Sequence, residues 1–291
     1  MDRPKLIILV GPPGSGKTSY GQQYIDTHKN TVMFSSDVIR KELYGDESIQ
    51  GNNNQVFYLM GQLTLDALNN GKDVVYDATN MTRKDRASII SVCPKFSQIE
   101  THIIWQPIET CIERDASRER SVGNGVIDKM LKRFQAPFFD EGIDDIKVVL
   151  PDDFDRYMYT SNTLDDMKIP HDNPHHTLNV YDHCVAAMEY VKHNYGICHD
   201  LMIATLLHDI GKPYCKEFKD AKGEPSETAH YYQHHCVSSW LSYGVNQVTP
   251  YIAWLISEHM NPFMNTKYYR NLPLFLKNKI DLLNEADRAA H

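Results

Sequence analysis

The chain has 291 residues, which is enough for two domains that each bury a core of their own. Hydrophobic residues make up 42% of it and charged residues 23%, which is typical of globular proteins and excludes disordered and fibrous classes. No apolar run is long enough to cross a bilayer, so we expect no membrane association. The net charge of −8 argues against a protein that coats nucleic acid non-specifically, but it is compatible with a local basic channel.

Cysteine usage and the N-terminal sequence both favour a cytoplasmic protein. The apolar run Leu6–Val10 is too short for the core of a signal peptide. The six cysteines show no CxxC pair and no disulfide framework, so we expect reduced thiols. They are Cys93, Cys111, Cys184, Cys198, Cys215 and Cys236.

The first half of the chain alternates short apolar segments with helical patterns. This alternation is typical of an α/β domain with a mainly parallel sheet and helices on both faces. The expected strands are Lys5–Val10, Thr31–Ser35, Asp73–Asp77, Thr101–Gln106 and Lys147–Leu150. The expected helices are Lys17–Thr27, Val38–Tyr44, Asn54–Asn69, Thr82–Cys93, Ile108–Ser117 and Gly125–Phe134.

The strand signal fades from about Pro151. A segment rich in Asp, Asn, Pro and Thr then predicts a linker with a few ordered turns. The helical patterns that follow predict an all-α bundle. They cover Val180–Asn194, Asp200–Asp209, His234–Tyr243, Thr249–His259 and Leu274–Ala290. We therefore expect an α/β domain at 1–150, a linker at 151–172 and a helical domain at 173–291.

A glycine-rich loop follows the first expected strand and opens the first expected helix. Its spacing, GxxxxGK[ST], is that of a phosphate-binding loop (P-loop). The glycines let backbone N–H groups point at phosphates, Lys17 reaches the β and γ oxygens, and Thr18 can ligate Mg²⁺. We predict that ATP or GTP binds there with Mg²⁺. The residues concerned are Gly11, Gly14, Ser15, Gly16, Lys17 and Thr18.

Polar residues also follow the second and third expected strands. Asp37 can accept the proton of an attacking hydroxyl, and Arg40 can hold a phosphate of the acceptor. The alternative is a helix N-cap at Asp37 with a solvated Arg40. Asp77 is a candidate magnesium partner and Asn80 a candidate acceptor contact, because ligands bind at this edge of such sheets. A helix cap is the alternative for both.

Three arginines recur after the fourth expected strand, on a polar helix that we expect to break at Gly123. Arg114 and Arg118 are four residues apart and share a face, so with Arg120 they can close over the transferring phosphoryl group and neutralise its charge. The alternative is a solvated helix with ion pairs to neighbouring glutamates. Those glutamates are Glu113 and Glu119.

Together these motifs resemble the kinase domain of phage-type polynucleotide 5′-kinases and their P-loop relatives. The resemblance covers about the first 150 residues and includes SDxxR, DxTN, RxxxR and the sequence at 130–137. It implies that Asp37 is the general base toward a 5′-hydroxyl and that Arg40 contacts the acceptor's phosphate. It also implies that Arg114 and Arg118 contact the phosphates of ATP.

The second half carries the sequence His208-Asp209-Ile210-Gly211-Lys212 at the end of an apolar helix. An adjacent imidazole and carboxylate can bind one divalent ion, or the carboxylate can bridge two. Two ligands are too few for a site. Further candidates are His183, His234 or His235, His259 and Asp287.

This half resembles the HD-domain phosphohydrolases from roughly Asn173 onward, and HDxGK is the most specific part of the likeness. The resemblance implies one or two divalent transition metals, for which Mn²⁺, Ni²⁺, Co²⁺ and Fe²⁺ are all suitable. Asp281 is the alternative to Asp287, and one-metal members of the family lack the ligand at His259. Lys212 is the candidate for stabilising phosphate charge. The implied ligands are His183, His208, Asp209, His234, His259 and Asp287.

Other residues give weaker signals. We expect the histidines near the linker to be solvated, and an aromatic group to lie in the core instead of stacking on bases. The histidines are His171, His175 and His176, and the aromatic residues are Phe263, Tyr268, Tyr269 and Phe275. Several basic residues near the expected cleft favour a polynucleotide. They are Arg83, Lys84, Arg86, Lys129, Lys132 and Arg133.

The leading interpretation is a bifunctional enzyme that heals nucleic-acid ends. The kinase would phosphorylate 5′-hydroxyl ends of single-stranded or nicked RNA or DNA, and the metal site would remove a 2′- or 3′-phosphate or a 2′,3′-cyclic phosphate. A ligase acting downstream is the expected partner. The alternatives are a nucleoside or nucleotide kinase fused to a nucleotide phosphohydrolase, and a non-enzymatic nucleotide sensor. The oligomeric state stays open.

Overall fold

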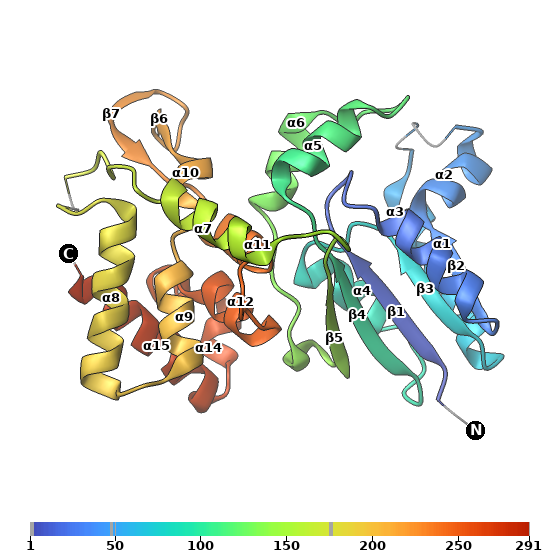
Figure 1. Ribbon diagram of the computed structural model, residues 1–291. Coiled ribbons are helices and arrows are strands. Elements are labelled where there is room, and N and C mark those ends of the chain that lie inside the picture. Colours follow the sequence, from blue (N-terminus) through green and yellow to red (C-terminus); the bar gives the residue numbers. More distant parts are fainter. Residues whose placement is uncertain (1–2, 47–48, 50, 175–176, 291) are drawn as a thin grey trace. The chain divides into compact units, whose positions relative to one another are not determined.

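The computed structural model describes residues 3–46, 49, 51–174 and 177–290, and it divides into two compact units (Figure 1). The first unit comprises Met1–Met130 and Pro137–Asp152, and the second comprises Leu131–Ala136 and Asp153–His291. Among the described residues, no helix combines the length and the apolar character needed to cross a membrane.

The first unit is built on a sheet of five parallel strands in the order β2-β3-β1-β4-β5 (Figure 1). The strands are β1 Lys5–Val10, β2 Thr31–Ser35, β3 Asp73–Asp77, β4 Gln98–Ile104 and β5 Asp145–Val149. The predicted parallel sheet with flanking helices is confirmed. Strand β4 begins three residues earlier than predicted, because Gln98 is already paired with Lys5 of β1. Strand β5 likewise begins at Asp145, opposite Glu100.

Six helices belong to the chain segments between and beside these strands. They are α1 Lys17–Thr27, α2 Ser36–Tyr44, α3 Asn53–Asn69, α4 Arg83–Ile90, α5 Ile108–Ala116 and α6 Asn124–Leu131, with a short 3₁₀ turn at Phe139–Glu141. Helix α4 is shorter than predicted. Its N-cap is Thr82, which forms a reciprocal capping box with Asp85. Helix α6 ends at Leu131, before the predicted end at Phe134.

Strand β1 is the middle strand of the sheet and forms its apolar centre. Its residues from Leu6 to Val10 are fully buried, since β3 and β4 pair with it on either side. A central strand buried on both faces reads as a continuous hydrophobic run. The P-loop leaves the carboxyl end of this strand, which places it at the edge where parallel α/β sheets bind ligands.

A buried carboxylate connects three strands of the sheet. Glu100 of β4 lies 2.7 Å from the Lys5 ammonium and 2.9 Å from the Lys147 ammonium. Burial acts to raise the pKa of Glu100, but hydrogen bonds from the two lysines outweigh it and hold the pKa at about 2, below the ordinary 4.5. A carboxyl group with a depressed pKa stabilises the fold above its unfolded pKa, and this stability is lost as the pH falls toward the folded pKa.

We therefore expect the free energy of unfolding to decrease as the pH falls from about 4.5 toward 2. Glu100→Gln should lower that free energy at pH 7 by about 1–2 kcal/mol and flatten its pH dependence, because the two lysines lose their charged partner. Urea unfolding at pH 7, 4 and 3 measures both effects. Glu113→Gln on the exposed face of α5 is the control, and an equally steep pH dependence in Glu100→Gln would contradict the assignment.

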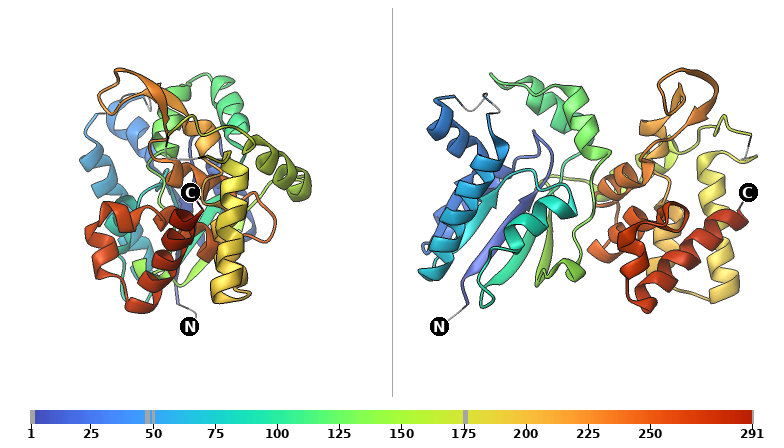
Figure 2. Two further views of the ribbon diagram at one scale, coloured as in Figure 1. Left: turned by 90° about the vertical axis from the view of Figure 1, so that its left-hand side faces the viewer. Right: turned by 180° about the vertical axis from the view of Figure 1, so that it is seen from behind.

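The second unit is mainly helical (Figure 2). Its larger helices are α7 Arg156–Asp166, α8 Val180–Tyr195, α9 His199–Leu207, α11 His234–Ser242, α12 Pro250–Glu258 and α15 Leu274–Ala289. Its short elements are α10 Lys212–Cys215, α13 Asn261–Met264, α14 Lys267–Asn271 and the antiparallel strands β6 Glu217–Lys219 and β7 Pro225–His230. The predicted all-α composition is wrong in that the hairpin β6–β7 lies between α10 and α11.

The prediction that residues 151–172 form a linker with a few ordered turns is also wrong, because this segment contains helix α7. Asp155 caps this helix by accepting hydrogen bonds from the backbone N–H groups of Tyr157 and Met158. The Asp-rich sequence thus marks the start of a helix, because the Asp155 carboxylate satisfies N–H groups of the first turn. Phe134 was expected in the α/β domain at 1–150, but it belongs to the second unit. Its ring packs edge-on against Trp240 of the same unit, with 5.4 Å between centroids.

Candidate functional site

The P-loop has the backbone conformation that its glycines were expected to provide. Gly14 and Gly16 have φ angles of +79° and +93°, in the left-handed region that glycine adopts without strain. Gly16 is the N-cap of α1, so Lys17 begins the helix, and the free N–H groups of its first turn can bind an anion. The Lys17 ammonium donates to the carbonyl of Pro12 at 2.9 Å. Burial lowers the pKa of Lys17 to about 8, although the Asp77 carboxylate opposes this shift.

Gly14 is the position of the loop with the least space. A Cβ atom there would lie 2.1 Å from the carbonyl oxygen of Cys111, whereas Gly45 has the same positive φ and no atom within 4 Å. Gly14→Ala is therefore expected to displace the P-loop, lower the melting temperature and weaken ATP binding at least tenfold. Gly45→Ala should lower the free energy of unfolding by only about 1 kcal/mol, the conformational penalty for a side chain at positive φ. Thermal unfolding and titration with ATP test the pair, and equal effects would contradict the steric argument.

Two predicted magnesium-site residues are in contact. The Thr18 hydroxyl donates to the Asp77 carboxylate at 2.9 Å, and Asp77 is almost fully buried at the end of β3. A hydroxyl on the first turn after a P-loop and a carboxylate on a neighbouring strand are the oxygen ligands that a nucleotide-bound Mg²⁺ uses. Helix α4 is capped by Thr82, so Asp77 is not its cap.

Asn80 makes a structural contact with the end of β1. Its side chain is buried, and its amide donates to the carbonyl of Leu9 at 2.7 Å. Its backbone lies in the left-handed region, and Gly11 N–H donates to the neighbouring Thr79 carbonyl. The amide thus holds the start of the P-loop in place. Its predicted contact with an acceptor stays a prediction.

Asp37 and Arg40 form an ion pair on the first turns of α2. The Arg40 guanidinium donates to the Asp37 carboxylate at 2.9 Å and to the Asn53 side-chain oxygen at 3.1 Å, and it lies over the ring of Phe57. The N-cap of α2 is Ser35, so the alternative that made Asp37 a cap is wrong, and so is the solvated Arg40. The Arg40 side chain is 10% exposed and that of Asp37 is 53% exposed. The carboxylate is thus fixed on one side and open on the other.

The predicted arginine helix is shorter than expected. Helix α5 ends at Ala116, so Arg118 and Arg120 lie beyond it and only Arg114 belongs to the helix. The chain turns because the buried Asp115 carboxylate accepts from the Ser121 hydroxyl at 2.7 Å and from two backbone N–H groups. The Arg114 guanidinium lies near the P-loop, 3.8 Å from where a Cβ on Gly16 would be. The positive charge of Arg118 contributes to lowering the pKa of Lys17.

Two of the basic residues expected near a cleft are engaged in the fold. Arg86 is fully buried and makes two hydrogen bonds of 2.8 Å to the Glu141 carboxylate. Arg83 pairs with Asp140 at 2.9 Å. The expectation that Arg86 faces a polynucleotide is therefore wrong, because a bidentate buried pair leaves the guanidinium no open face. Of the others, Lys84, Lys129 and Arg133 are exposed and Lys132 is half-buried.

The second unit brings all six predicted metal ligands together. They form one group of His183, His208, Asp209 and Asp287 and another of Asp209, His234 and His259. Within each group the donor atoms lie within 4.8 Å of one another, and Asp209 belongs to both. Five helices supply them: α8 carries His183, α15 carries Asp287, His208 and Asp209 follow α9, His234 begins α11 and His259 follows α12.

Short distances join the nitrogen and oxygen atoms at the centre. His183 Nε2 and His208 Nε2 lie 2.9 Å and 3.3 Å from Asp287 Oδ1. His234 Nε2 lies 3.1 Å from Asp209 Oδ1 and 3.2 Å from His259 Nε2. These atoms therefore face a common space around the Asp209 carboxylate.

The backbone fixes the orientation of three of the imidazoles in the same way. In each, Nδ1 donates to the carbonyl three residues earlier, which leaves Nε2 as the atom that faces the group. The distances are 2.6 Å from His208 to Thr205, 2.8 Å from His234 to Tyr231 and 2.7 Å from His259 to Ile256. In metal-binding histidines generally, one ring nitrogen binds the metal and the other donates its N–H to a group such as a backbone carbonyl.

Buried polar atoms in the group fit a divalent cation. Asp209 is 1% exposed, and neither of its carboxylate oxygens makes a hydrogen bond of suitable geometry to any described residue, despite the close nitrogens. The same holds for His208 Nε2. Burial acts to raise the pKa of Asp209, but the charges of His208 and Lys212 outweigh it and keep it well below its ordinary value. A buried carboxylate among imidazoles is a donor set suited to transition metals.

The structure also distinguishes between the alternative ligands. His234 Nε2 reaches Asp209, whereas the ring of the neighbouring His235 packs edge-on against His234 and His259. Burial and the neighbouring His234 lower the pKa of His235 to about 3. Asp281 accepts a hydrogen bond from the Tyr269 hydroxyl, and Asp287 is the carboxylate of α15 that joins the histidines.

Lys212 and His171 adjoin the metal-ligand group. The Lys212 ammonium lies 2.6 Å from Asp209 Oδ2 and 3.1 Å from His171 Nε2. The expectation of a solvated linker histidine is wrong for His171, which is 2% exposed and held by the fold. No periodicity marked this residue, because it lies in an irregular segment. His175 and His176 lie outside the described residues.

The aromatic residues near the C-terminus divide into two kinds. Tyr269 is buried as expected, and the Tyr268 hydroxyl accepts from the Trp254 indole at 3.2 Å. Phe263 and Phe275 are 57% and 69% exposed, so the expectation of a core position is wrong for both.

Comparison with known proteins gives a match to the first unit. Residues 6–137 match the family model described as an AAA domain. The match spans less than half of the chain, includes the P-loop and supports nucleotide binding by this unit. A curated relative, "Transcription factor bHLH140" of Arabidopsis thaliana, is 25% identical over 171 residues. The match covers 56% of this chain but only 18% of that protein.

Solved structures with a likeness to this chain include RNA-directed and small-molecule kinases. The structure of the Pnkp1/Rnl/Hen1 RNA repair complex matches with 23% identity and a TM-score of 0.43, over 46% of this chain and 44% of that one. A fungal RNA kinase matches with 14% identity and a TM-score of 0.39, over 57% and 84% of the two chains. A gluconokinase from Sinorhizobium meliloti 1021 matches with 17% identity and a TM-score of 0.37, over 52% and 86%.

Proposed function

We propose that the first unit is an ATP-dependent kinase that phosphorylates a hydroxyl group on an acceptor that itself carries phosphate. The observation that carries this proposal is the Asp37–Arg40 ion pair on α2. It offers an exposed carboxylate as a base and, beside it, a guanidinium held in place by Asn53. A sugar or other uncharged acceptor needs the carboxylate but not the guanidinium.

The roles of the residues follow from their chemistry. Asp37 accepts the proton of the attacking hydroxyl while Arg40 contacts a phosphate of the acceptor. Backbone N–H groups at 14–18 hold the nucleotide's phosphates, and Lys17 and Arg114 neutralise charge that develops on the transferred group. Thr18 and Asp77 would hold Mg²⁺, which would supply positive charge that offsets the negative charge of the nucleotide's phosphates. The proposed acceptor is the 5′-hydroxyl end of single-stranded or nicked RNA or DNA.

We further propose that residues 173–291 form an HD-type phosphohydrolase domain. The observation that favours this second activity is the pair of ligand groups that share Asp209. Divalent ions such as Mn²⁺, Ni²⁺, Co²⁺ or Fe²⁺ held there would activate water as a nucleophile. Lys212 is close enough to Asp209 to contact the substrate's phosphate. The proposed substrates are a 2′- or 3′-phosphate or a 2′,3′-cyclic phosphate.

The two activities together would convert a broken strand into one that a ligase can join, since ligation needs a 5′-phosphate and a free 3′-hydroxyl. The alternative is a nucleoside or nucleotide kinase joined to a nucleotide phosphohydrolase. γ-labelled ATP with a panel of 5′-hydroxyl oligonucleotides, 3′-phosphorylated nucleosides and free nucleosides separates them. We expect label on the oligonucleotides and on the 3′-phosphorylated nucleosides. Label on free nucleosides alone would reject the proposal.

A further inference from the structure

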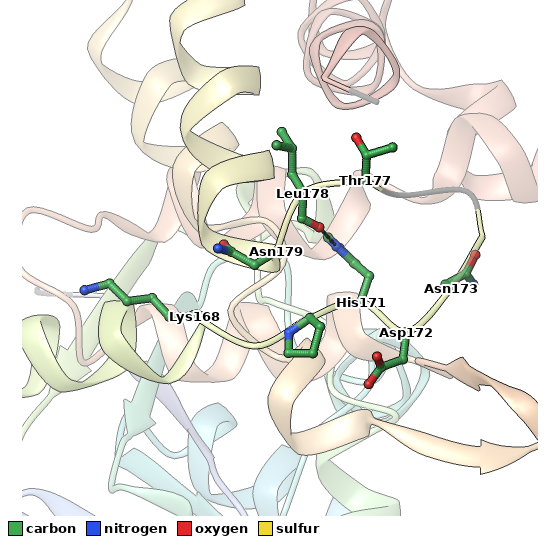
Figure 3. Close-up of a pocket in the computed structure, with 8 residues that line it drawn as sticks. Lys168, His171, Asp172, Asn173, Thr177, Leu178 and Asn179 are labelled. Atoms are coloured by element: carbon green, nitrogen blue, oxygen red, sulfur yellow. Dashed lines mark hydrogen bonds between the residues drawn. The ribbon is translucent and has the colours of Figure 1, made fainter.

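A buried histidine beside the metal-ligand group has no place in the roles given so far. His171 lies in the segment between α7 and α8, in a loop closed by an isolated bridge between Pro170 and Asn179. Described residues of this loop line a pocket of about 490 Å³, and the His171 side chain points toward the carbonyl of Leu178 (Figure 3). Two hydrogen bonds hold the backbone at His171 and Asp172, because Ala229 N–H donates to the Asp172 carbonyl at 2.9 Å and the Tyr231 hydroxyl donates to the His171 carbonyl.

The two nitrogens of the His171 ring have partners that fix its tautomer. Nδ1 lies 2.8 Å from the carbonyl oxygen of Leu178, which can only accept, so Nδ1 carries the proton. Nε2 lies 3.1 Å from the Lys212 ammonium, which can only donate, so Nε2 presents its lone pair. The two contacts independently require the same neutral tautomer. The hydrogen bond to the Leu178 carbonyl thus fixes the ring, and the ring in turn fixes the position of the Lys212 ammonium.

Lys212 needs such a partner because Asp209, with which it forms an ion pair, is one of the proposed metal ligands. Its ammonium lies 2.6 Å from Asp209 Oδ2. The Tyr231 ring lies 5.4 Å from the ammonium and offers a weaker, non-directional attraction. A long lysine side chain released from Asp209 would adopt many rotamers, and its loss of freedom on meeting a phosphate would weaken binding.

We propose that His171 is a positioning residue: in its Nδ1-protonated form it accepts a hydrogen bond from Lys212 and holds that ammonium beside the metal-ligand group, where it meets the substrate's phosphate. This inference rests on the proposed phosphohydrolase activity for its purpose, but its structural content, the tautomer and the hydrogen bond, can be measured without any activity.

The first test is a long-range ¹H–¹⁵N spectrum of the full-length protein labelled with ¹⁵N-histidine. His171→Gln identifies the His171 signals by their disappearance. We expect a protonated Nδ1 and an unprotonated Nε2, and we expect Lys212→Met to shift the Nε2 resonance. Lys219→Met, at an exposed position of β6, should leave it unchanged. A protonated Nε2, or an Nε2 resonance that Lys212→Met does not move, would overturn the inference.

The second test separates positioning from structure. His171→Leu removes the acceptor, and His171→Gln offers a side-chain oxygen in its place. With the metal content unchanged, we expect His171→Leu to lower kcat/KM for a 3′-phosphorylated oligonucleotide about tenfold and His171→Gln to restore most of it. Combining His171→Leu with Lys212→Met should cost no more than Lys212→Met alone. Additive losses would overturn the coupling. If the wild-type protein hydrolyses no phosphate ester, the phosphohydrolase proposal fails, and the spectrum still decides the His171–Lys212 contact.

Discussion

Asp209→Asn is expected to abolish binding of divalent transition metals to the second unit. Asp209 is the residue that both ligand groups share, and an amide can neither supply the negative charge nor present two acceptor oxygens. Loss of residues around a metal's ligands already weakens binding 10- to 100-fold, so loss of a shared ligand should exceed about 100-fold. Metal analysis after gel filtration, together with hydrolysis of a 3′-phosphorylated oligonucleotide, measures the effect.

The matched control is Asp200→Asn, at a more exposed position on the first turn of α9, the helix that precedes Asp209. It should retain full metal content, and both variants should retain transfer of the γ-phosphate from ATP. Full metal occupancy in Asp209→Asn would contradict the assignment of Asp209 as the ligand that both groups share. Loss of kinase activity in a folded Asp209→Asn protein would contradict the assignment of the two activities to separate sites.

Asp37→Asn is expected to lower the rate of phosphoryl transfer by about 10²–10⁴, the contribution typical of a general base. Binding of ATP should change little, because Asp37 lies outside the P-loop and its partner Arg40 keeps its contact with Asn53. Single-turnover transfer to a 5′-hydroxyl oligonucleotide and calorimetric titration with ATP measure the two quantities.

Glu42→Gln, on the exposed side of the same helix, is the control for this substitution and should behave like the wild type. A variant Asp37→Asn that transfers phosphate at the normal rate would remove the base from the proposed mechanism. A variant that also loses phosphohydrolase activity while folded would again contradict two independent sites.

Most of the first unit could be predicted from the sequence because its signals are local. The apolar run before Gly11 and the spacing of the P-loop specify a strand, a turn and a helix within a few residues, and the structure has all three. The length of α5 could not be predicted, since it depends on the buried Asp115 carboxylate and the loop that folds back onto it. The burial of Arg86 depends likewise on Glu141, which lies 55 residues away.

In the second unit, the order of the candidate ligands along the chain predicted which residues lie together. The residues that surround them could not be predicted. The structure brings together the six residues that the resemblance implied, although their metal-binding role stays a prediction. His171 could not be found, because it lies in an irregular segment and its ring contacts Lys212, which is 41 residues away in the chain. A helix was missed at α7 because its capping Asp155 lies in an Asp-rich segment that resembles a linker.

The anchoring of the three histidine rings to carbonyls three residues earlier has a consequence for how the cluster tolerates change. Each ring takes its direction from the turn of backbone that carries it, so a substitution that leaves this turn in place also leaves the direction of the ring intact. Only shifts of one helix against another alter the spacing between Nε2 atoms. The spacing of the donor atoms in this cluster is therefore a property of helix packing.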